Sequence, residues 1–289
     1  MPHWQNLIAL LRERGISVSD VDMPRPVGGG DISSAWCLRT SARPVFVKTG
    51  PASAYDAFLA EAEGLKELAR AGAIRVPQVL GCITSATESL LALEWIEFEL
   101  ADAHSERRLG RQLAMQHRCC ADRFGWHRDN TIGATPQQNQ WSEDWVDFFA
   151  EQRLGFQLEL AARNGYTGAI QTGGRRLLDR LGHFFAGYWT EASLLHGDLW
   201  GGNWAVADGE PVIFDPAVYY GDREADIAMT RLFGGFGRAF YDTYERSWPL
   251  AAGHEERLLV YQLYHVLNHL NLFGAGYLTR AENIIRRLL

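Results

Sequence analysis

Apolar residues are spaced differently in the two halves of the chain. In the first half they form short runs bounded by Gly, Pro or Ser, which predict strands over 34–38, 44–48, 79–83 and 90–96. A helical pattern over 54–71 places Phe58, Leu65 and Leu68 on one face and ends at Gly72, a favourable C-terminal cap. The first half therefore predicts a small antiparallel sheet that carries one helix.

Longer helical patterns dominate the second half. They predict helices over 106–120, 143–163, 174–189, 222–233, 255–273 and 277–288. One strand-rich segment, 194–216, interrupts them and contains most of the polar residues that suggest chemistry. The chain is therefore predicted to be an α+β protein of two lobes, a small one over residues 1–97 and a larger, mainly helical one over residues 98–289.

Composition narrows the class of protein. Hydrophobic residues make up 47% of the 289 positions and charged residues 22%, as in ordinary globular proteins, and the net charge of −7 argues against a nucleic-acid partner. Four cysteines without a CxxC pair favour a reduced, cytoplasmic protein. The N-terminus predicts an amphipathic helix with Trp4, Leu7, Ile8 and Leu11 on one face, not a signal peptide, and no apolar run is long enough to span a membrane.

A catalytic-loop pattern lies within the strand-rich segment, in the run HGDLWGGN over 196–203. The spacing of Asp198 and Asn203 matches the kinase pattern H-x-D-x-x-x-x-N, in which the aspartate faces the acceptor hydroxyl and the asparagine offers an oxygen to magnesium. Asp198 is therefore the candidate catalytic residue. We expect His196 to pack and hydrogen-bond rather than to transfer a proton.

A second carboxylate, Asp215, follows the apolar run PVIF over 211–214. It stands where a kinase places its second metal contact, and Mg²⁺ prefers hard oxygen ligands with only one or two protein carboxylates. Asn203 and Asp215 are therefore the candidate metal ligands. Asp-Pro alone indicates a turn and His-Gly-Asp alone a loop, but their order here favours a phosphoryl-transfer site.

Two charged residues further along leave alternatives open. Asp226 precedes an apolar helix and could hold the backbone of the catalytic loop, or it could remain solvated at the helix N-terminus. Arg223 could contact a phosphate, or it could pair with Asp222 or Glu224.

Candidate contacts to the phosphates of ATP lie in the first half. Gly29 and Gly30 belong to a Gly-rich run whose amides could cover the phosphates, although hairpin turns use glycine too. Lys48 ends an apolar strand and resembles the strand lysine that contacts the α- and β-phosphates in kinases. Glu61 projects from the apolar face of its helix, where an unpaired carboxylate would be costly, so we expect an ion pair with Lys48.

A strand ending at Glu94, Trp95 and Ile96 is the candidate contact to adenine. We expect its backbone edge to be exposed where the lobes join, so that the Glu94 carbonyl and the Ile96 amide can hydrogen-bond the base. An edge strand without a ligand is the alternative.

Together these motifs resemble the fructosamine and ketosamine 3-kinase family, within the aminoglycoside-phosphotransferase-like kinases. The similarity is carried by HGDLWGGNW (196–204), FDPA (214–217), YGDREADIAM (220–229), NTIG (130–133), TPQ (135–137) and DFFAEQRL (147–154). The last three are not demanded by a generic kinase pattern. The resemblance covers nearly the whole chain and implies a protein-kinase-like fold that binds the nucleotide in its N-terminal lobe.

The resemblance also implies the reaction, which is transfer of the ATP γ-phosphate to the C3 hydroxyl of a ketosamine with the help of Mg²⁺. The unstable product would shed the sugar and so deglycate the amine. By the same resemblance, Asp198 accepts the proton, Asn203 and Asp215 hold magnesium, Lys48 with Glu61 positions the phosphates, and Trp200 lines the sugar site.

Two other functions remain open at this stage. The same fold could phosphorylate another small alcohol, such as an aminoglycoside, choline or homoserine. The chain could also be a catalytically silent nucleotide-binding scaffold, although the intact set of Lys48, Asp198, Asn203 and Asp215 argues against it. The expected partner is a free or protein-bound ketosamine, and we expect a monomer.

Overall fold

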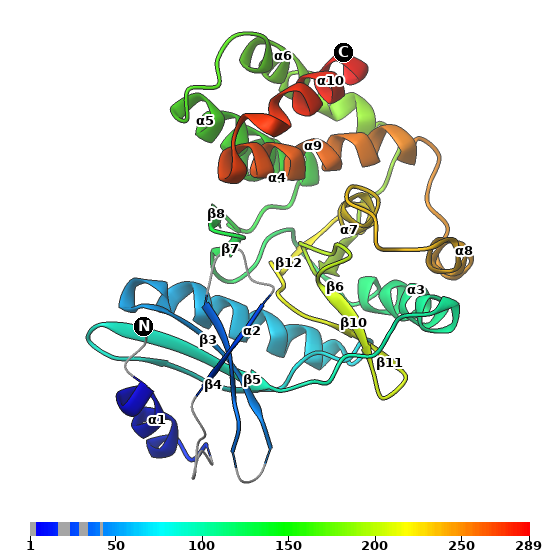
Figure 1. The fold of residues 1–289 in the computed structure, drawn as a ribbon. Coiled ribbons are helices and arrows are strands. Elements are labelled where there is room, and N and C mark those ends of the chain that lie inside the picture. The colour runs from blue at the N-terminus through cyan, green and yellow to red at the C-terminus, as the bar shows by residue number, and fades with distance from the viewer. Residues whose placement is uncertain (1–3, 17–23, 29–33, 41–42) are drawn as a thin grey trace.

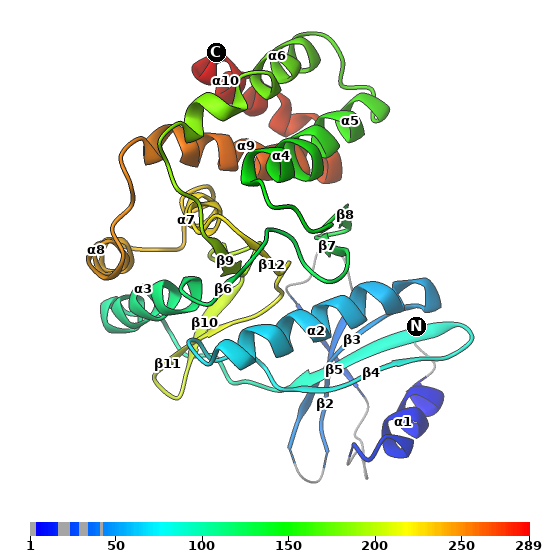
Figure 2. The same cartoon turned by 180° about the vertical axis from the view of Figure 1, so that it is seen from behind.

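The computed structural model describes residues 4–16, 24–28, 34–40 and 43–289. It consists of a small lobe built on a sheet and a larger lobe built mainly of helices (Figure 1), and the view from behind shows the same division (Figure 2). The predicted α+β fold with two lobes is therefore confirmed. Gly29 and Gly30, the candidate phosphate contacts, lie outside the described residues.

The small lobe contains an antiparallel sheet with the strand order β1-β2-β3-β5-β4. Its strands are β1 (Arg25–Val27), β2 (Ser34–Leu38), β3 (Val45–Pro51), β4 (Val79–Thr84) and β5 (Glu88–Glu94). β5 pairs with β3 on one side and with β4 on the other, so it lies inside the sheet. The prediction that its backbone forms an exposed edge is wrong, because β1 and β4 are the edges of this sheet as described.

The central strands of this sheet are buried on both faces, because α1 (Trp4–Glu13) and α2 (Tyr55–Ala71) cover opposite sides of it (Figure 1). In β5, Leu90 and Ala92 belong to the core beneath α1, whereas Leu91 and Leu93 belong to the core beneath α2. Alternating side chains of a strand point to opposite faces, so a continuous apolar run is what a two-sided sheet requires. The two predicted amphipathic helices are confirmed.

The large lobe is helical. Its helices are α3 (Ala103–His117), α4 (Trp145–Phe149), the π-helical turn η2 (Ala150–Gly155), α5 (Phe156–Arg163), α6 (Ala169–Leu178), α7 (Glu224–Thr230), α8 (Arg238–Ser247), α9 (His254–Phe273) and α10 (Leu278–Leu288). Short 3₁₀ turns of this lobe lie over Leu181–Phe185 (η3) and Ala275–Tyr277 (η4), and another, Ala52–Ala54 (η1), precedes α2 in the small lobe. None of the helices in the described part is both long and apolar enough to cross a bilayer.

The large lobe also contains short strands, which lie between its helices along the chain. They are β6 (Cys120–Ala121), β7 (Asn130–Ile132), β8 (Thr135–Gln137), β9 (Ala192–Leu195), β10 (Trp204–Ala207), β11 (Glu210–Ile213) and β12 (Tyr219–Gly221). β9 lies between β12 and β6, while β10 and β11 form a hairpin. The catalytic-loop motif therefore connects β9 to this hairpin, as the strand-rich segment predicted.

Two helices differ from the prediction. The helix expected over 174–189 begins earlier, at Ala169, and ends at Leu178, after which the chain continues as the 3₁₀ turn η3. α8 is not predicted by the sequence pattern, because its sequence is mostly polar and only Phe240 and Tyr244 are buried. It packs against α3 instead of contributing a broad apolar stripe.

Candidate active site

A buried lysine joins three elements at the base of the site. The Nζ of Lys48 on β3 lies 2.8 and 2.9 Å from the two carboxylate oxygens of Glu61 on α2, and 2.8 Å from Oδ1 of Asp215 after β11. Burial alone would lower the pKa of Lys48, but the charges of Glu61 and Asp215 raise it above its ordinary value. The predicted Lys48–Glu61 ion pair is confirmed, and the same lysine contacts a candidate metal ligand.

The catalytic loop is fixed by a glycine and by Asp226. Gly197 has a φ of +81°, and a Cβ at this position would lie 2.0 Å from the carbonyl oxygen of Ala217. Only glycine fits such a backbone. Oδ2 of Asp226 accepts a hydrogen bond from the amide of His196 at 2.8 Å, and Oδ1 accepts one from the amide of Gly197 at 2.9 Å. Of the two alternatives for Asp226, anchoring of the loop is therefore correct.

Two buried histidines complete this anchor. Nε2 of His117 lies 3.1 Å from Oδ2 of Asp226, and its Nδ1 lies 2.9 Å from the hydroxyl of Tyr244. Nε2 of His196 lies 2.9 Å from the carbonyl oxygen of Phe214. Burial lowers the pKa of both imidazoles and so favours their neutral form. His196 thus packs and hydrogen-bonds as predicted, whereas the sequence carries no signal for His117 on α3.

Asp198 presents a carboxyl group whose ionisation lies near neutral pH. Burial raises its pKa to about 7, and the charges of Asp215 and Asp226 act in the same direction. Nδ2 of Asn203 donates to the carbonyl oxygen of Asp198 at 2.9 Å and lies 3.4 Å from its Oδ2. The two residues are adjacent, as their spacing predicts, and a carboxylate with such a pKa suits a general base.

Asn203 and Asp215 have the oxygens that a magnesium ion needs. Asp215 has a φ of +56°, an uncommon conformation for a residue other than glycine. Lys48 occupies its Oδ1, and the loop backbone occupies Nδ2 of Asn203, so Oδ2 of Asp215 and Oδ1 of Asn203 remain as hard oxygen donors. In the described part of the chain, no cluster of three or more His, Cys, Asp and Glu residues could hold a metal. Two protein ligands supplemented by phosphate and water are typical of Mg²⁺.

The β7–β8 hairpin supports the segment that follows Asp215. Nδ2 of Asn130 donates to the carbonyl oxygen of Val218 at 2.8 Å. Nε2 of Gln137 donates to the carbonyl oxygen of Ala217 at 3.1 Å and to Oδ1 of Asn130 at 2.8 Å. The motifs NTIG and TPQ therefore have a structural role, which is to fix the backbone next to a candidate metal ligand.

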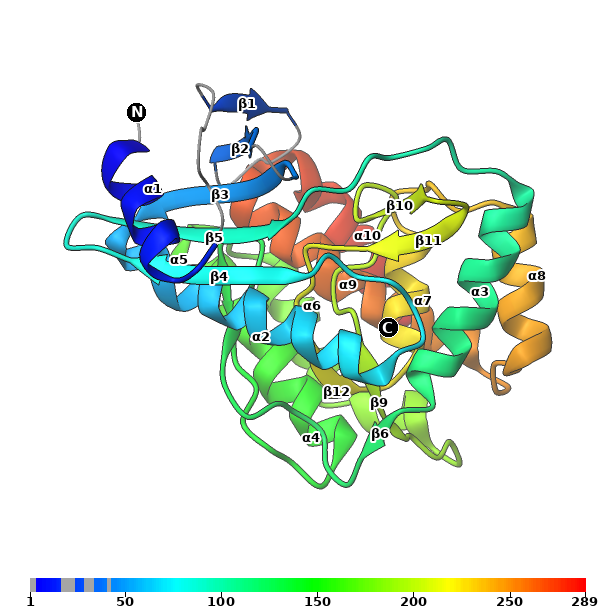
Figure 3. The same ribbon diagram turned by 90° about the horizontal axis from the view of Figure 1, so that it is seen from below.

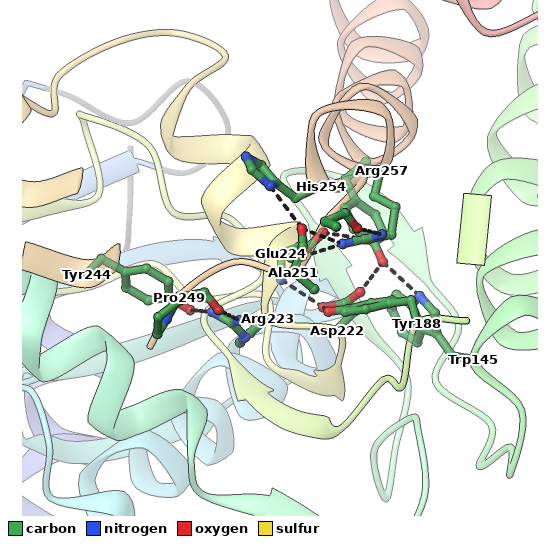
Figure 4. A network of polar contacts seen from close by, with 12 residues as sticks. Trp145, Tyr188, Asp222, Arg223, Glu224, Tyr244, Pro249, Ala251, His254 and Arg257 are labelled. Atoms are coloured by element: carbon green, nitrogen blue, oxygen red, sulfur yellow. Dashed lines mark hydrogen bonds and ion pairs between the residues drawn. The ribbon is translucent and has the colours of Figure 1, made fainter. Parts of the chain in front are cut away.

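Arg223 does not take either of its expected roles. Its guanidinium donates to the hydroxyl of Tyr244 at 3.1 Å and to the carbonyl oxygens of Trp248 and Pro249 at 3.0 and 2.6 Å (Figure 4). It also lies 4.2 Å from the centroid of the Trp248 ring. Pairing with a neighbouring carboxylate is therefore wrong, because Glu224 pairs with another arginine. A contact to phosphate is not supported either, because Arg223 does not line the cleft described below.

Glu224 belongs to a buried network in the large lobe (Figure 4). Its carboxylate accepts two hydrogen bonds from Arg257, at 2.8 and 2.9 Å. Asp222 accepts hydrogen bonds from the hydroxyls of Tyr261 and Tyr188 at 2.5 and 3.0 Å, and burial together with the charge of Glu224 raises its pKa. These contacts join α7 to α9 and lie outside the cleft, so the network is structural.

Six of the candidate residues face one cleft of about 890 Å³, whereas Glu94, Trp95 and Ile96 are not among the residues that line it. The six are Lys48, Glu61, Asp198, Trp200, Asn203 and Asp215. Lys48 and Asp215 are 167 positions apart in the sequence, yet they are in direct contact in this cleft.

One wall of this cleft is aromatic. Trp200 is 38% exposed, and Phe233, His269, Phe273 and Tyr277 line the same space. The ring of His269 lies 4.5 Å from that of Phe233 and 5.2 Å from that of Tyr277. Apart from Trp200, these residues are not identified from the sequence, because aromatic side chains in a helical pattern are more often part of a core.

The candidate adenine contact is changed by the interior position of β5. The Glu94 carboxylate accepts hydrogen bonds from Arg75 and from the amide of Gln78, and the Glu94 amide donates to the carbonyl oxygen of Gln78. Trp95 and Ile96 follow the end of the strand. Adenine recognition at Glu94, Trp95 and Ile96 therefore stays a prediction that depends on main-chain groups at the end of the strand.

Comparison with known proteins identifies close relatives. The model of the family described as fructosamine kinase matches residues 3–289. A protein of Synechocystis named a probable ketoamine kinase is 42% identical over 291 residues, which cover 99% of this chain and 97% of that protein. A rice protein (Oryza sativa subsp. indica) named protein-ribulosamine 3-kinase, chloroplastic, is 44% identical over 264 residues, covering 90% of this chain and 76% of that protein.

Solved structures give the same grouping. A crystal structure described as a fructosamine-3-kinase from Haemophilus somnus superposes with a TM-score of 0.91 at 29% identity, over 99% of this chain and 97% of that one. An aminoglycoside phosphotransferase superposes with a TM-score of 0.63 at 15% identity, over 96% of this chain and 97% of that one, which shows a shared fold.

Proposed function

Because the chain belongs to the fructosamine kinase family, we propose that it transfers the γ-phosphate of ATP to the C3 hydroxyl of ketosamines and thereby starts their deglycation. The observation that carries this proposal is the meeting of Lys48, Asp198, Asn203 and Asp215 in one cleft. The acceptors are fructosamine, ribulosamine or erythrulosamine adducts, free or bound to protein.

The nucleotide is assigned to the lobe formed by residues 1–97. Lys48, held by Glu61, contacts the α- and β-phosphates, and its ion pair keeps the ammonium charged and oriented. Amides of Gly29 and Gly30 cover the phosphates, and the main chain of Glu94, Trp95 and Ile96 contacts adenine.

Catalysis and acceptor binding are assigned to residues 98–289. Asp198 orients the C3 hydroxyl and accepts its proton, while Asn203 and Asp215 hold Mg²⁺, which neutralises phosphate charge when bound. Phosphoryl transfer asks little covalent chemistry of the protein, so positioning and charge account for most of the acceleration. Asp226 contributes indirectly, because it holds the two amides that precede Asp198.

The acceptor is assigned to the aromatic wall. The Trp200 ring would pack against the sugar beside Asp198, and the secondary ammonium of a ketosamine would lie near the faces of Phe233, Phe273 and Tyr277, where a cation is attracted. The wall provides no carboxylate of its own beyond those of the catalytic set among the described residues.

An ADP-release assay tests the proposal. Ribulosyl-, erythrulosyl- and fructosyl-lysine are compared with an aminoglycoside, choline and homoserine, and Asp198→Ala is the control for contaminating kinases. We expect ADP release with at least one ketosamine and none above background with the other alcohols. Turnover of another alcohol alone would replace the ketosamine assignment, and absence of turnover on every acceptor would support a silent nucleotide-binding protein.

We further propose that the enzyme acts in the cytoplasm as a monomer. The location rests on the four cysteines, none of which is paired with another among the described residues. Light scattering on the purified protein measures the oligomeric state, and a mass of twice the chain's 32.5 kDa would contradict the monomer.

A further inference from the structure

A second pocket, about 400 Å³ in volume, lies between α3 and α8, outside the catalytic cleft. The two helices run side by side at the edge of the large lobe (Figure 3). They approach closely because Gly110 has no side chain: a Cβ there would lie 2.4 Å from the carbonyl oxygen of Phe240. The pocket is lined by His104, Arg107, Arg108, Arg111, Thr243 and Arg246. Four arginines around one small pocket are unexpected in a chain whose net charge is −7.

The carboxylates of the two helices form no ion pair with these four arginines. On α3, Asp102 caps the helix by accepting from backbone amides, and Glu106 accepts from the amide of Gly237 at 2.8 Å. On α8, Asp242 pairs with Arg238, and Glu245 accepts from the amide of Leu250. Every acidic group of the pair of helices is therefore committed elsewhere.

The arginines themselves lack sufficient partners. Within the described residues, Arg107 and Arg111 have no ion pair, and Arg246 donates only to the hydroxyl of Thr243, at 2.9 Å. Arg108 pairs with Glu210, yet its Nε is buried without a hydrogen-bond partner. That nitrogen is not accessible from the pocket, so the groups available to a ligand are the exposed guanidinium groups of Arg107, Arg111 and Arg246.

We propose that this pocket binds a ligand with two or more linked phosphate groups. Arg107 and Arg111 lie one turn apart on α3, about 6 Å along the helix axis, a spacing closer to that of the two outer phosphates of a tripolyphosphate than to the size of a single tetrahedral ion. Guanidinium groups bind phosphate oxygens in bidentate fashion, and Arg246 closes the pocket from α8. The volume admits a chain of phosphates or the triphosphate part of a nucleotide.

Tripolyphosphate and ATP are the probes, each measured by calorimetry with the Lys48→Ala protein so that the catalytic cleft contributes little. We expect binding of tripolyphosphate to weaken about 100-fold when Arg107→Ala and Arg111→Ala are added, since two charge-assisted contacts are lost. The matched control is Arg175→Ala/Arg176→Ala, which removes the same charge from the exposed face of α6 and should leave binding unchanged.

Three results would overturn the proposal. The first is absence of tripolyphosphate binding to the Lys48→Ala protein, and the second is equal binding after either double substitution. The third is binding of a poly-glutamate peptide in preference to tripolyphosphate, which would make the surface a contact for acidic protein. If tripolyphosphate binds but ATP does not, the ligand is an oligophosphate without a nucleoside; if both bind, nucleotides are included.

Discussion

The pKa of a single carboxyl group, that of Asp198, connects the geometry of the cleft to its chemistry. Burial and two nearby carboxylates raise this pKa to about 7, so the group changes its charge within the physiological range. In the proposed reaction it must be ionised to accept a proton, whereas folding favours its neutral form. Substitution and pH therefore have separate, predictable effects at this residue.

Asp198→Ala should separate catalysis from nucleotide binding. We expect kcat to fall about 1,000-fold or more, because a positioned general base is lost, while affinity for Mg-ATP measured by calorimetry stays close to that of the wild type.

Asp215→Ala should instead lose magnesium-dependent nucleotide binding. An active Asp198→Ala enzyme, or unchanged Mg-ATP affinity of Asp215→Ala, would contradict the assigned roles.

The pH dependence of turnover should follow the ionisation of Asp198. We expect kcat/KM for ATP to fall about tenfold per pH unit below about pH 7, because only the ionised carboxyl group accepts a proton. Magnesium bound at Asp215 would remove part of the negative charge that raises this pKa, so kcat should decline only at lower pH. A flat profile between about pH 5.5 and 8 would disagree with a general base at this position.

Asp198→Asn should stabilise the fold at high pH. The folded-state pKa of Asp198 lies above its unfolded value, so its contribution to stability is present at low pH and is lost as the pH rises through about 7. An uncharged amide avoids this loss, and we expect the free energy of unfolding at pH 8 to increase by about 1–2 kcal/mol. Urea unfolding at pH 8 and pH 4 measures the effect, which should vanish at pH 4.

At the scale of elements, the site depends on helices that carry no catalytic residue. α7 supplies Asp226 to the loop, and α3 supplies His117 to Asp226. α7 is in turn joined to α9 by the ion pair between Glu224 and Arg257, whose side chains are 0% and 2% exposed. Breaking this buried ion pair should therefore lower the free energy of unfolding more than breaking a surface ion pair.

Arg257→Leu should destabilise the protein by about 3–5 kcal/mol, because it leaves Glu224 buried without its counterion. Adding Glu224→Leu should recover much of this loss, since both charges are then gone. The control is Arg238→Ala, which removes a surface pair with Asp242 and should change the free energy of unfolding by less than about 1 kcal/mol. Urea denaturation of the four proteins measures these differences, and equal losses in both single variants would refute the ranking.

At the scale of the whole molecule, the sequence predicts what local spacing determines. Asp198 and Asn203 lie in one loop, and Glu61 lies on the apolar face of one helix, so their placement follows from short-range pattern. The contact of Lys48 with Asp215 joins the two lobes and follows only from the resemblance to kinases. Arg223 makes neither of the two contacts considered for it, because its hydrogen bonds go to α8 and to the residues after that helix, which no local pattern identifies.

Features that depend on packing between distant segments also cannot be predicted from the local sequence pattern. β5 has an apolar run that fits both an edge and an interior strand, and only the pairing with β3 and β4 decides between them. The aromatic wall combines Phe233, after α7, with residues from the end of α9 and from η4, so its members are recognisable only once the large lobe is folded.

The most direct test of the account is ³¹P NMR of the reaction of ATP and Mg²⁺ with ribulosyl-lysine labelled with ¹³C at C3. The account predicts a phosphomonoester resonance coupled to the labelled carbon, followed by release of unmodified lysine, with neither seen for Asp198→Ala. Phosphate attached to another carbon, or hydrolysis of ATP without any phosphorylated sugar, would contradict it.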